Sequence, residues 1–317
     1  MDKVCVARRI PQAGLDLIAQ HAEMILSPHD RALTREELMD LCTGCRVLVA
    51  TLANRIDRDF LLARPEIRLV ANVAVGYDNV DLVAAREFGV MVSNTPGVLT
   101  DATADLTMLL ILALLRRLVE GDRLVRAGEF RGMHPLFMLG SDPRGKVLGI
   151  YGMGRIGEAV AQRALSFGMK IVYHNRHPRP EAERELSAEY LGFDEFLGAC
   201  DVLAITAPLT EETRGVFNYQ AFKRMRPSAY LVNTGRGPIV VEEDLVRALD
   251  DRLIAGAGLD VYEFEPKVHP GLIELPNVIL SPHLGSATIE TRNQMAALAA
   301  HNVIAFLHGQ DLPSRVV

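Results

Sequence analysis

The stretch KVLGIYGMGRIG, residues 146–157, decides the fold class of this chain. After Lys146, residues 147–151 form a short apolar run, and KVLGIY as a whole predicts a buried strand. Three glycines follow at the spacing Gly152-x-Gly154-x-x-Gly157, and a helix is expected from Gly157 to Phe167. A strand, a glycine turn and a helix in this order, with another strand about 20 residues on, predict a dinucleotide-binding βαβ unit.

The glycines of this turn have separate expected roles. Gly152 allows the tight turn, Gly154 lets a pyrophosphate approach the backbone, and Gly157 lets the helix pack closely on the strand. The helix N-terminus offers amides to an anion. The alternative is a glycine-rich turn that holds no ligand. The candidates for cofactor contact here are Gly152, Met153, Gly154, Arg155, Ile156 and Gly157.

The end of the next expected strand, residues 170–174, indicates which dinucleotide is bound. An NAD site has an acid there that holds the ribose 2′-hydroxyl. This chain has Asn175, Arg176 and His177 instead, with Arg179 close behind and no acid before Glu181. Because a guanidinium can bind a 2′-phosphate, NADP(H) is favoured over NAD(H). The alternative is a basic surface cluster that only caps a turn.

On both sides of this stretch, apolar runs alternate with helical patterns along most of the chain. We expect a six-strand parallel sheet from residue 146 to about 282, and an earlier βα block that ends near residue 97. A late helix at 286–307 could return to that first block. The remaining expected strands lie at 4–8, 47–50, 69–73, 90–92, 202–206, 230–233, 255–260 and 278–281.

Composition excludes several classes of protein. The 317 residues suggest two domains at ~150 residues each, and 49% apolar with 23% charged residues is typical of globular chains. A net charge of −6 makes nucleic acid an unexpected partner. No apolar run approaches the ~18 residues of a membrane span.

The N-terminus lacks a signal peptide, and four scattered cysteines indicate a cytoplasmic protein. Cys42 and Cys45 have CxxC spacing without a second ligand pair, so no metal is expected.

Residues 101–119 form a helix pattern that is apolar nearly all round from Leu106 to Leu115. Such a helix is buried on several faces, either in a core or between subunits. We favour a homodimer interface.

Three loops at the ends of expected strands carry side chains suited to the reduction of a 2-keto acid. Arg236 could bind the carboxylate and polarise the ketone, because its planar fork matches two oxygens. His283 could donate the proton that the carbonyl oxygen needs. Glu265 could hold the histidine in its cationic form. Each alone is equally compatible with a structural role, but all three follow strands of one sheet, where ligands bind.

These loops, Asn233–Gly237, Asp260–Pro266 and Pro282–Thr288, together with Gly152–Gly157, resemble the D-isomer-specific 2-hydroxyacid dehydrogenases. Residues 72–81 and 94–103 look most like the glyoxylate/hydroxypyruvate reductase branch. The resemblance implies two doubly wound parallel-sheet α/β domains with a cleft between them. Residues 98–284 would bind the dinucleotide, and 1–97 with 285–317 would form the substrate-binding domain.

The resemblance also implies roles for individual residues. Arg236, Glu265 and His283 would be catalytic, and the backbone amides of Val75 and Gly76 would bind the substrate with Arg236 and His283. Asp260 would face the nicotinamide carboxamide. The family is commonly dimeric. Further cofactor contacts are expected at Thr107, Thr206, Ala207, Pro208, Thr234, Gly235 and Gly285.

We therefore expect an NADPH-preferring reductase that converts glyoxylate, hydroxypyruvate or both to D-2-hydroxy acids. One alternative is a dehydrogenase of another 2-hydroxy acid, such as 3-phosphoglycerate. A second is a non-catalytic dinucleotide sensor, against which the complete Arg/Glu/His set argues. The chain has no tryptophan, and Phe130 and Phe137 occupy the segment where related reductases often have one. This difference leaves the substrate size open.

Overall fold

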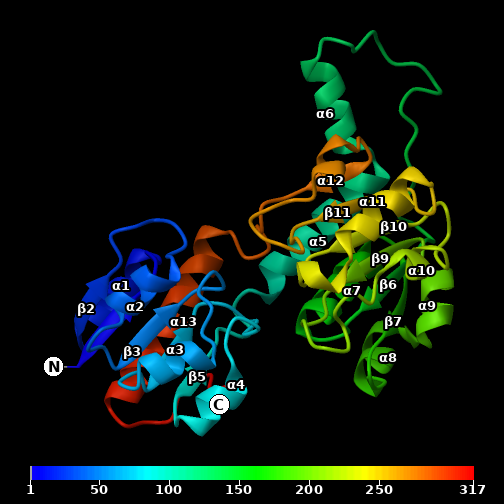
Figure 1. The fold of residues 1–317 in the computed structure, drawn as a ribbon. Coiled ribbons are helices and arrows are strands. Elements are labelled where there is room, and N and C mark those ends of the chain that lie inside the picture. Colours follow the sequence, from blue (N-terminus) through cyan, green and yellow to red (C-terminus); the bar gives the residue numbers. More distant parts are fainter. Residues whose placement is uncertain (1) are drawn as a thin grey trace. The chain divides into compact units, whose positions relative to one another are not determined.

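The computed structural model describes residues 2–317, which divide into two compact units (Figure 1). Unit 1 comprises the residues up to Leu99 together with Ser286–Val317, and unit 2 comprises Thr100–Gly285. Each unit is built on a sheet of parallel strands. The chain thus has the two parallel-sheet α/β domains that the sequence predicts.

The sheet of unit 1 has the strand order β2-β1-β3-β4-β5. Its central strands are continuous apolar runs, and nearly all their residues are buried because the sheet has an apolar core on each face. The edge strand β2 is only partly buried and was not expected. The strands are β1 (Lys3–Val6), β2 (Glu23–Leu26), β3 (Val47–Ala50), β4 (Leu69–Asn72) and β5 (Met91–Ser93).

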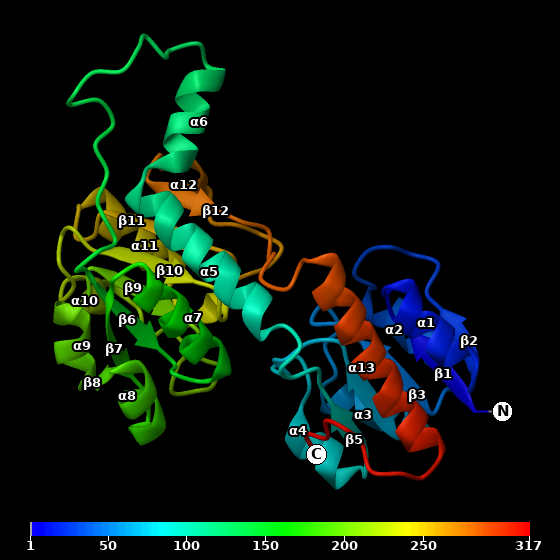
Figure 2. The same cartoon turned by 180° about the vertical axis from the view of Figure 1, so that it is seen from behind.

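Five helices cover this sheet. Helices α1 (Gln12–Ala19) and α13 (Ile289–Leu307) pack on one face, and the sequence-distant α13 lies against α1 and β4 (Figure 2). Gly14 permits this contact, since a Cβ there would lie 2.7 Å from the Ala296 carbonyl oxygen. The other face is covered by α2 (Arg35–Leu41), α3 (Arg58–Ala63) and α4 (Leu82–Glu87), of which α3 was not expected.

Residues 314–317 pair with the outer edge of β5. The Val316 amide donates to the Val92 carbonyl at 2.7 Å, and the Val92 amide donates to Val317 at 3.1 Å. The Asn94 amide donates to the Ser314 carbonyl at 3.2 Å. This antiparallel pairing covers an edge that would otherwise present open backbone groups.

The sheet of unit 2 has seven parallel strands in the order β12-β11-β10-β9-β6-β7-β8. The expected set of six was one strand short, because the two-residue edge strand β8 lacks an apolar run. The strands are β6 (Val147–Tyr151), β7 (Lys170–His174), β8 (Glu189–Tyr190), β9 (Val202–Ile205), β10 (Tyr230–Asn233), β11 (Gly256–Leu259) and β12 (Val278–Leu280).

Helices lie on both faces of this sheet, each over its own apolar core. One face carries α5 (Thr100–Leu115), α7 (Arg155–Ser166) and α8 (Pro180–Leu186). The other carries α9 (Phe193–Ala199), α10 (Tyr219–Phe222), α11 (Glu242–Asp250) and α12 (Pro270–Glu274). A short 3-10 turn, η1, spans Gly237–Ile239.

The prediction of one helix over residues 101–119 is wrong in its extent. Helix α5 ends at Leu115, and Arg117 adopts a left-handed conformation with φ of 52°, so α6 (Leu118–Arg126) is a separate helix. Nine residues of α5 are buried, and the helix packs on α7, β10 and β11 within unit 2. The core of this unit therefore accounts for the buried apolar residues of α5, while Leu109 is 55% exposed.

Residues 118–142, which we call the arm, project from unit 2 (Figures 1 and 2). Helix α6 has no buried residue. Apolar side chains nevertheless recur along the arm and are more than half exposed, namely Leu118, Val125, Phe130, Met133, Leu136 and Leu139. Phe130 and Phe137 contact each other with ring centroids 6.2 Å apart.

Candidate active site

The glycine turn joins β6 to α7 as expected, although the helix begins at Arg155, two residues earlier than predicted. Gly152 has a φ of 104°, and a Cβ on it would lie 2.5 Å from the Ala207 amide nitrogen. A Cβ on Gly157 would lie 2.6 Å from the Gly152 carbonyl oxygen. Both positions therefore require glycine, one for conformation and space, the other for space alone.

The same turn fits the pyrophosphate of a dinucleotide. Gly154 is the N-cap of the 12-residue helix α7 and supplies no capping side chain. Among residues 2–317, no acceptor receives a hydrogen bond from the amides of Arg155 or Ile156. No atom lies within 4 Å of a Cβ position on Gly154. Open space beside unpaired amides at a helix N-terminus favours an anion.

The end of β7 lies beside this turn. The Asn175 side-chain oxygen accepts a hydrogen bond from the Met153 amide at 2.7 Å. Arg176 and His177 are exposed. Arg179 is paired with Glu158 at 2.8 Å, and the charge of Arg176 is one of the causes that lower the pKa of Glu212.

The loop after β9 also contacts the glycine turn. The Thr206 hydroxyl donates to the Gly152 carbonyl at 2.8 Å, and Ala207 packs against Gly152. Pro208 follows and is exposed. Thr107 of α5 is fully buried, and its hydroxyl lies 2.8 Å from that of Thr234. Several of the expected cofactor residues thus surround one region of unit 2.

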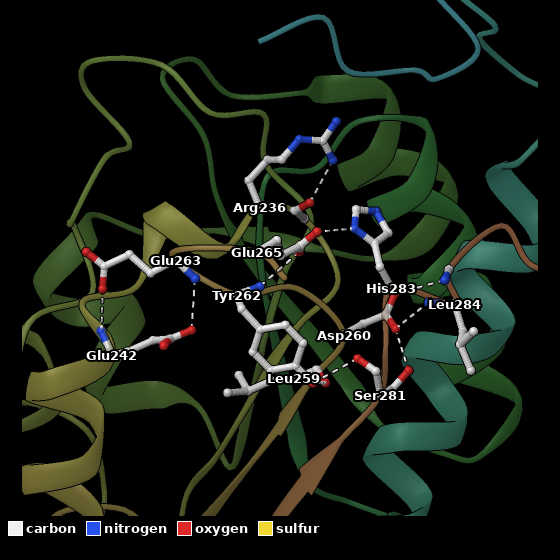
Figure 3. Close-up of polar contacts among 12 residues, drawn as sticks. Arg236, Glu242, Leu259, Asp260, Tyr262, Glu263, Glu265, Ser281, His283 and Leu284 are labelled. Carbon is white, nitrogen blue, oxygen red and sulfur yellow. Dashed lines mark hydrogen bonds and ion pairs between the residues drawn. The ribbon is translucent and has the colours of Figure 1, made fainter. Parts of the chain in front are cut away.

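His283 and Glu265 form the polar centre of this region (Figure 3). The imidazole Nδ1 lies 2.9 Å from a carboxylate oxygen of Glu265, and the two side chains are 34% and 36% exposed. Partial burial acts to raise the pKa of Glu265. The hydrogen bond and charge of His283, the Tyr262 amide and the charge of Arg236 outweigh it, so the pKa lies below its usual value. Glu265 is therefore an anion at neutral pH.

Arg236 belongs to the loop after β10. Asn233 shapes this loop, because its side chain accepts from the Gly235 amide at 3.1 Å and donates to the Arg236 carbonyl at 3.0 Å. The Arg236 guanidinium donates to the Gly235 carbonyl at 2.9 Å. Its effect on the pKa of Glu265 places it within electrostatic range of the His283–Glu265 pair.

The carboxylate of Asp260 holds the loop that carries His283. It is 1% exposed and accepts hydrogen bonds from the Ser281 hydroxyl, from the Leu284 amide at 2.7 Å and from the Gly285 amide at 2.8 Å. His283 itself has a φ of 56°. Successive amides around a left-handed residue form a nest for an anion, and here the anion is internal. A contact of Asp260 with the nicotinamide stays a prediction.

A second brace fixes the loop that carries Glu265. Glu242 and Glu263 each accept a hydrogen bond from the other's backbone amide, at 2.8 and 3.0 Å (Figure 3). The His269 amide also donates to Glu242 at 3.2 Å. Ser281, Glu242, Glu263 and Asn233 were not predicted as site residues, since their roles are hydrogen bonds to loop amides that no sequence spacing reveals.

Val75 and Gly76, the expected substrate-binding amides, belong to unit 1. They lie in the loop after β4 and are partly exposed. Among residues 2–317, neither amide donates to a protein acceptor.

Other features of the described residues bear on function. Cys42 and Cys45 are buried beside Cys5, with the sulfurs of Cys5 and Cys42 3.4 Å apart. No group of metal-ligating side chains occurs within residues 2–317. In the same part of the chain no helix has the length and apolar character needed to cross a bilayer.

Comparisons with known proteins identify the family of this chain. The family model for the D-isomer specific 2-hydroxyacid dehydrogenase NAD-binding domain matches residues 108–285. The glyoxylate reductase of Thermococcus onnurineus is 46% identical, and the match covers 99% of this chain and 95% of that protein.

Two solved structures are also similar over nearly their full lengths. The TT0316 protein of Thermus thermophilus is 42% identical with a TM-score of 0.92, covering 99% of this chain and 100% of that one. The NADPH-dependent glyoxylate/hydroxypyruvate reductase of Sinorhizobium meliloti, solved with NADP and malonate, is 33% identical with a TM-score of 0.88, covering 100% and 97%. The chain therefore belongs to the D-isomer-specific 2-hydroxyacid dehydrogenase family and is an enzyme that uses a nicotinamide dinucleotide.

Proposed function

We propose that this enzyme is an NADPH-preferring reductase of glyoxylate, hydroxypyruvate or both, producing glycolate from the first and D-glycerate from the second. The observation that carries the proposal is the His283–Glu265 pair, 2.9 Å apart, with Arg236 in electrostatic range and in the unit that holds the glycine turn. The names of the relatives support this substrate class.

In the proposed reaction, the reduced nicotinamide, when bound, supplies a hydride to the carbonyl carbon. Nε2 of the His283 imidazolium gives its proton to the carbonyl oxygen, which becomes the hydroxyl of the product. Glu265 accepts the hydrogen bond from Nδ1 and stabilises the cation before transfer. Arg236 binds the carboxylate and polarises the ketone.

Unit 1 would be the substrate-binding domain and unit 2 the dinucleotide-binding domain. In this role the amides of Val75 and Gly76 would bind the substrate carboxylate. A carboxylate is a strong acceptor for backbone amides, so unpaired amides on a partly exposed loop suit it.

Steady-state kinetics test the proposal. Glyoxylate and hydroxypyruvate are each assayed with NADPH and NADH, and 3-phosphoglycerate, which is already a hydroxy acid, is assayed with NADP+ and NAD+. We expect absorbance of the reduced nicotinamide to fall with one or both of the first two acids. Preference for 3-phosphoglycerate would favour the other dehydrogenase. Cofactor binding without turnover of any 2-keto acid would favour a dinucleotide sensor.

Arg176 is proposed to set the cofactor preference. We expect Arg176→Ala to raise the KM for NADPH about tenfold and to leave the KM for NADH nearly unchanged, because only NADPH has a 2′-phosphate for the guanidinium. Arg184→Ala on α8 is the matched control, since it removes another exposed positive charge. Equal changes for both cofactors would contradict the assignment.

Glu265 is proposed to set the upper pH limit of reduction. Reduction takes a proton from His283, so the rate of reduction falls at high pH. Glu265→Gln removes the carboxylate that stabilises the cation, and we expect this fall to begin about one pH unit lower. The pH profile of kcat/KM in the reductive direction measures the shift. An unchanged profile would contradict the pairing.

We also propose a homodimer. Its interface would include the 101–119 helix, as the sequence predicts, and the arm, where exposed apolar side chains gather. The protein's mass in solution, with and without charged substitutions at Met133 and Leu136, tests this assignment.

A further inference from the structure

The loop that carries Val75 and Gly76 is held by its carbonyl groups. The Ala74 carbonyl accepts from the Thr95 amide at 2.8 Å. The Val75 carbonyl accepts from the Asn94 side chain at 2.8 Å, and the Gly76 carbonyl accepts from the Asn72 side chain at 2.9 Å. Three consecutive carbonyls therefore have fixed directions.

Fixed carbonyls also fix the amides. In a planar trans peptide, the N–H of one residue points opposite to the carbonyl of the residue before it. The bond to Ala74 thus orients the Val75 amide, and the bond from Asn94 orients the Gly76 amide. Neither amide donates to an acceptor within residues 2–317, so both stay available to a ligand.

Asn94 is itself held by a chain of hydrogen bonds from residues far away in sequence. The Ser314 hydroxyl donates to the Asn94 carbonyl at 2.6 Å, and the Ser314 carbonyl accepts from the Asn94 amide at 3.2 Å. The Asn302 side chain, fully buried in α13, donates to the Ser314 hydroxyl at 2.8 Å and accepts from its amide at 3.1 Å. Asn302, Ser314 and Asn94 form one continuous line that ends at Val75.

We propose that Ser314 and Asn302 are positioning residues for substrate: through Asn94 they fix the Gly76 amide in the direction needed to bind a carboxylate. This inference rests on the proposed function, in which these amides bind a 2-keto acid. The pairing of residues 314–317 with β5 then serves binding as well as the sheet edge.

The test compares Ser314→Ala with Ser27→Ala. Ser27 follows β2 at the opposite edge of the same sheet, and its hydroxyl also bonds to backbone, donating to the His29 carbonyl at 3.4 Å. We expect Ser314→Ala to raise the KM for glyoxylate about tenfold, with kcat and the Kd for NADPH nearly unchanged. The reason is that the Gly76 amide would lose its hydrogen bond to the charged substrate carboxylate, and such a loss has about this effect. Ser27→Ala should change none of them.

Two further variants separate positioning from folding. Ser314→Thr keeps the hydroxyl and should restore the wild-type KM. Asn94→Ala removes the bond to the Val75 carbonyl directly and should raise the KM at least as much as Ser314→Ala. If Ser314→Ala does not fold, the KM of Asn94→Ala tests the inference instead. An unchanged KM, or equal effects on substrate and cofactor binding, would overturn the inference.

Binding of oxalate to the holoenzyme, measured by calorimetry, distinguishes this inference from the proposed function. We expect oxalate to bind about tenfold more weakly to Ser314→Ala than to the wild type. Suppose that the wild type reduces no 2-keto acid but the variant still binds oxalate more weakly than the wild type does. That result would refute the proposed function and support the positioning role. Equal binding by both proteins, or none by the wild type, would overturn the positioning role.

Discussion

Replacing His283 with asparagine is expected to lower kcat for reduction about 10²–10⁴-fold, the usual contribution of a positioned general acid. Asparagine has no group that donates a proton at neutral pH. It does tolerate the left-handed conformation that His283 adopts at a φ of 56°, so the loop should keep its shape. Initial rates at saturating substrate and cofactor measure the effect.

The Kd for the dinucleotide is the control for this variant. Asp260 holds the loop through the Leu284 and Gly285 amides, which the substitution leaves in place. We therefore expect cofactor binding close to that of the wild type. A variant that keeps more than about a tenth of the wild-type kcat would show that another group donates the proton.

Alanine at Gly152 and alanine at Gly154 are expected to have opposite consequences. The Gly152→Ala methyl group would lie 2.5–2.8 Å from atoms of Ala207, on a backbone with a φ of 104°. Overpacking and backbone strain together should lower the free energy of unfolding by about 2–5 kcal/mol. Gly154→Ala meets no atom within 4 Å and should leave that free energy nearly unchanged.

The difference should reverse when dinucleotide binding is measured. A methyl group on Gly154 would occupy the space through which a pyrophosphate approaches the helix N-terminus, so we expect the Kd to rise roughly tenfold or more. Chemical denaturation gives the free energy of unfolding of each variant, and cofactor titration gives the Kd of each for the dinucleotide. Normal cofactor affinity in Gly154→Ala would mean that the phosphates bind elsewhere.

Much of the fold could be predicted because its signals are local. The run before Gly152 and the buried strands at 47–50 and 230–233 are continuous apolar segments, which only a sheet covered on both faces accommodates. The edge strands β2 and β8 give a weaker signal, since β2 is only partly buried and β8 has two residues. Their pairing depends on neighbours that the sequence alone does not place.

The break between α5 and α6 shows a different limit. The sequence at Arg116-Arg117 contains neither glycine nor proline, so the helical pattern runs through it without interruption. Local contacts hold the left-handed Arg117: its guanidinium pairs with Glu120 and donates to the Leu139 carbonyl at 3.4 Å. Contacts of this kind have no sequence periodicity.

The candidate site was predictable where chemistry selects the residue type. Arg236, Glu265 and His283 follow strand ends and have side chains suited to a keto acid, and the structure shows His283 hydrogen-bonded to Glu265. The residues that support them act by geometry. Nothing in the sequence distinguishes Glu242 and Ser281 from other polar residues, because their roles depend on hydrogen bonds that only the structure shows.

The division of unit 1 into two sequence segments has a consequence for synthesis on the ribosome. Its core needs Ala296, Ala300 and Val303 of α13, packed beside Leu15 and Ile18 of α1. The ribosome has translated all of unit 2 before these residues of α13 emerge from the exit tunnel. Until then α1 alone covers this face of the first sheet, so part of its apolar surface stays exposed until a segment made after unit 2 completes the domain.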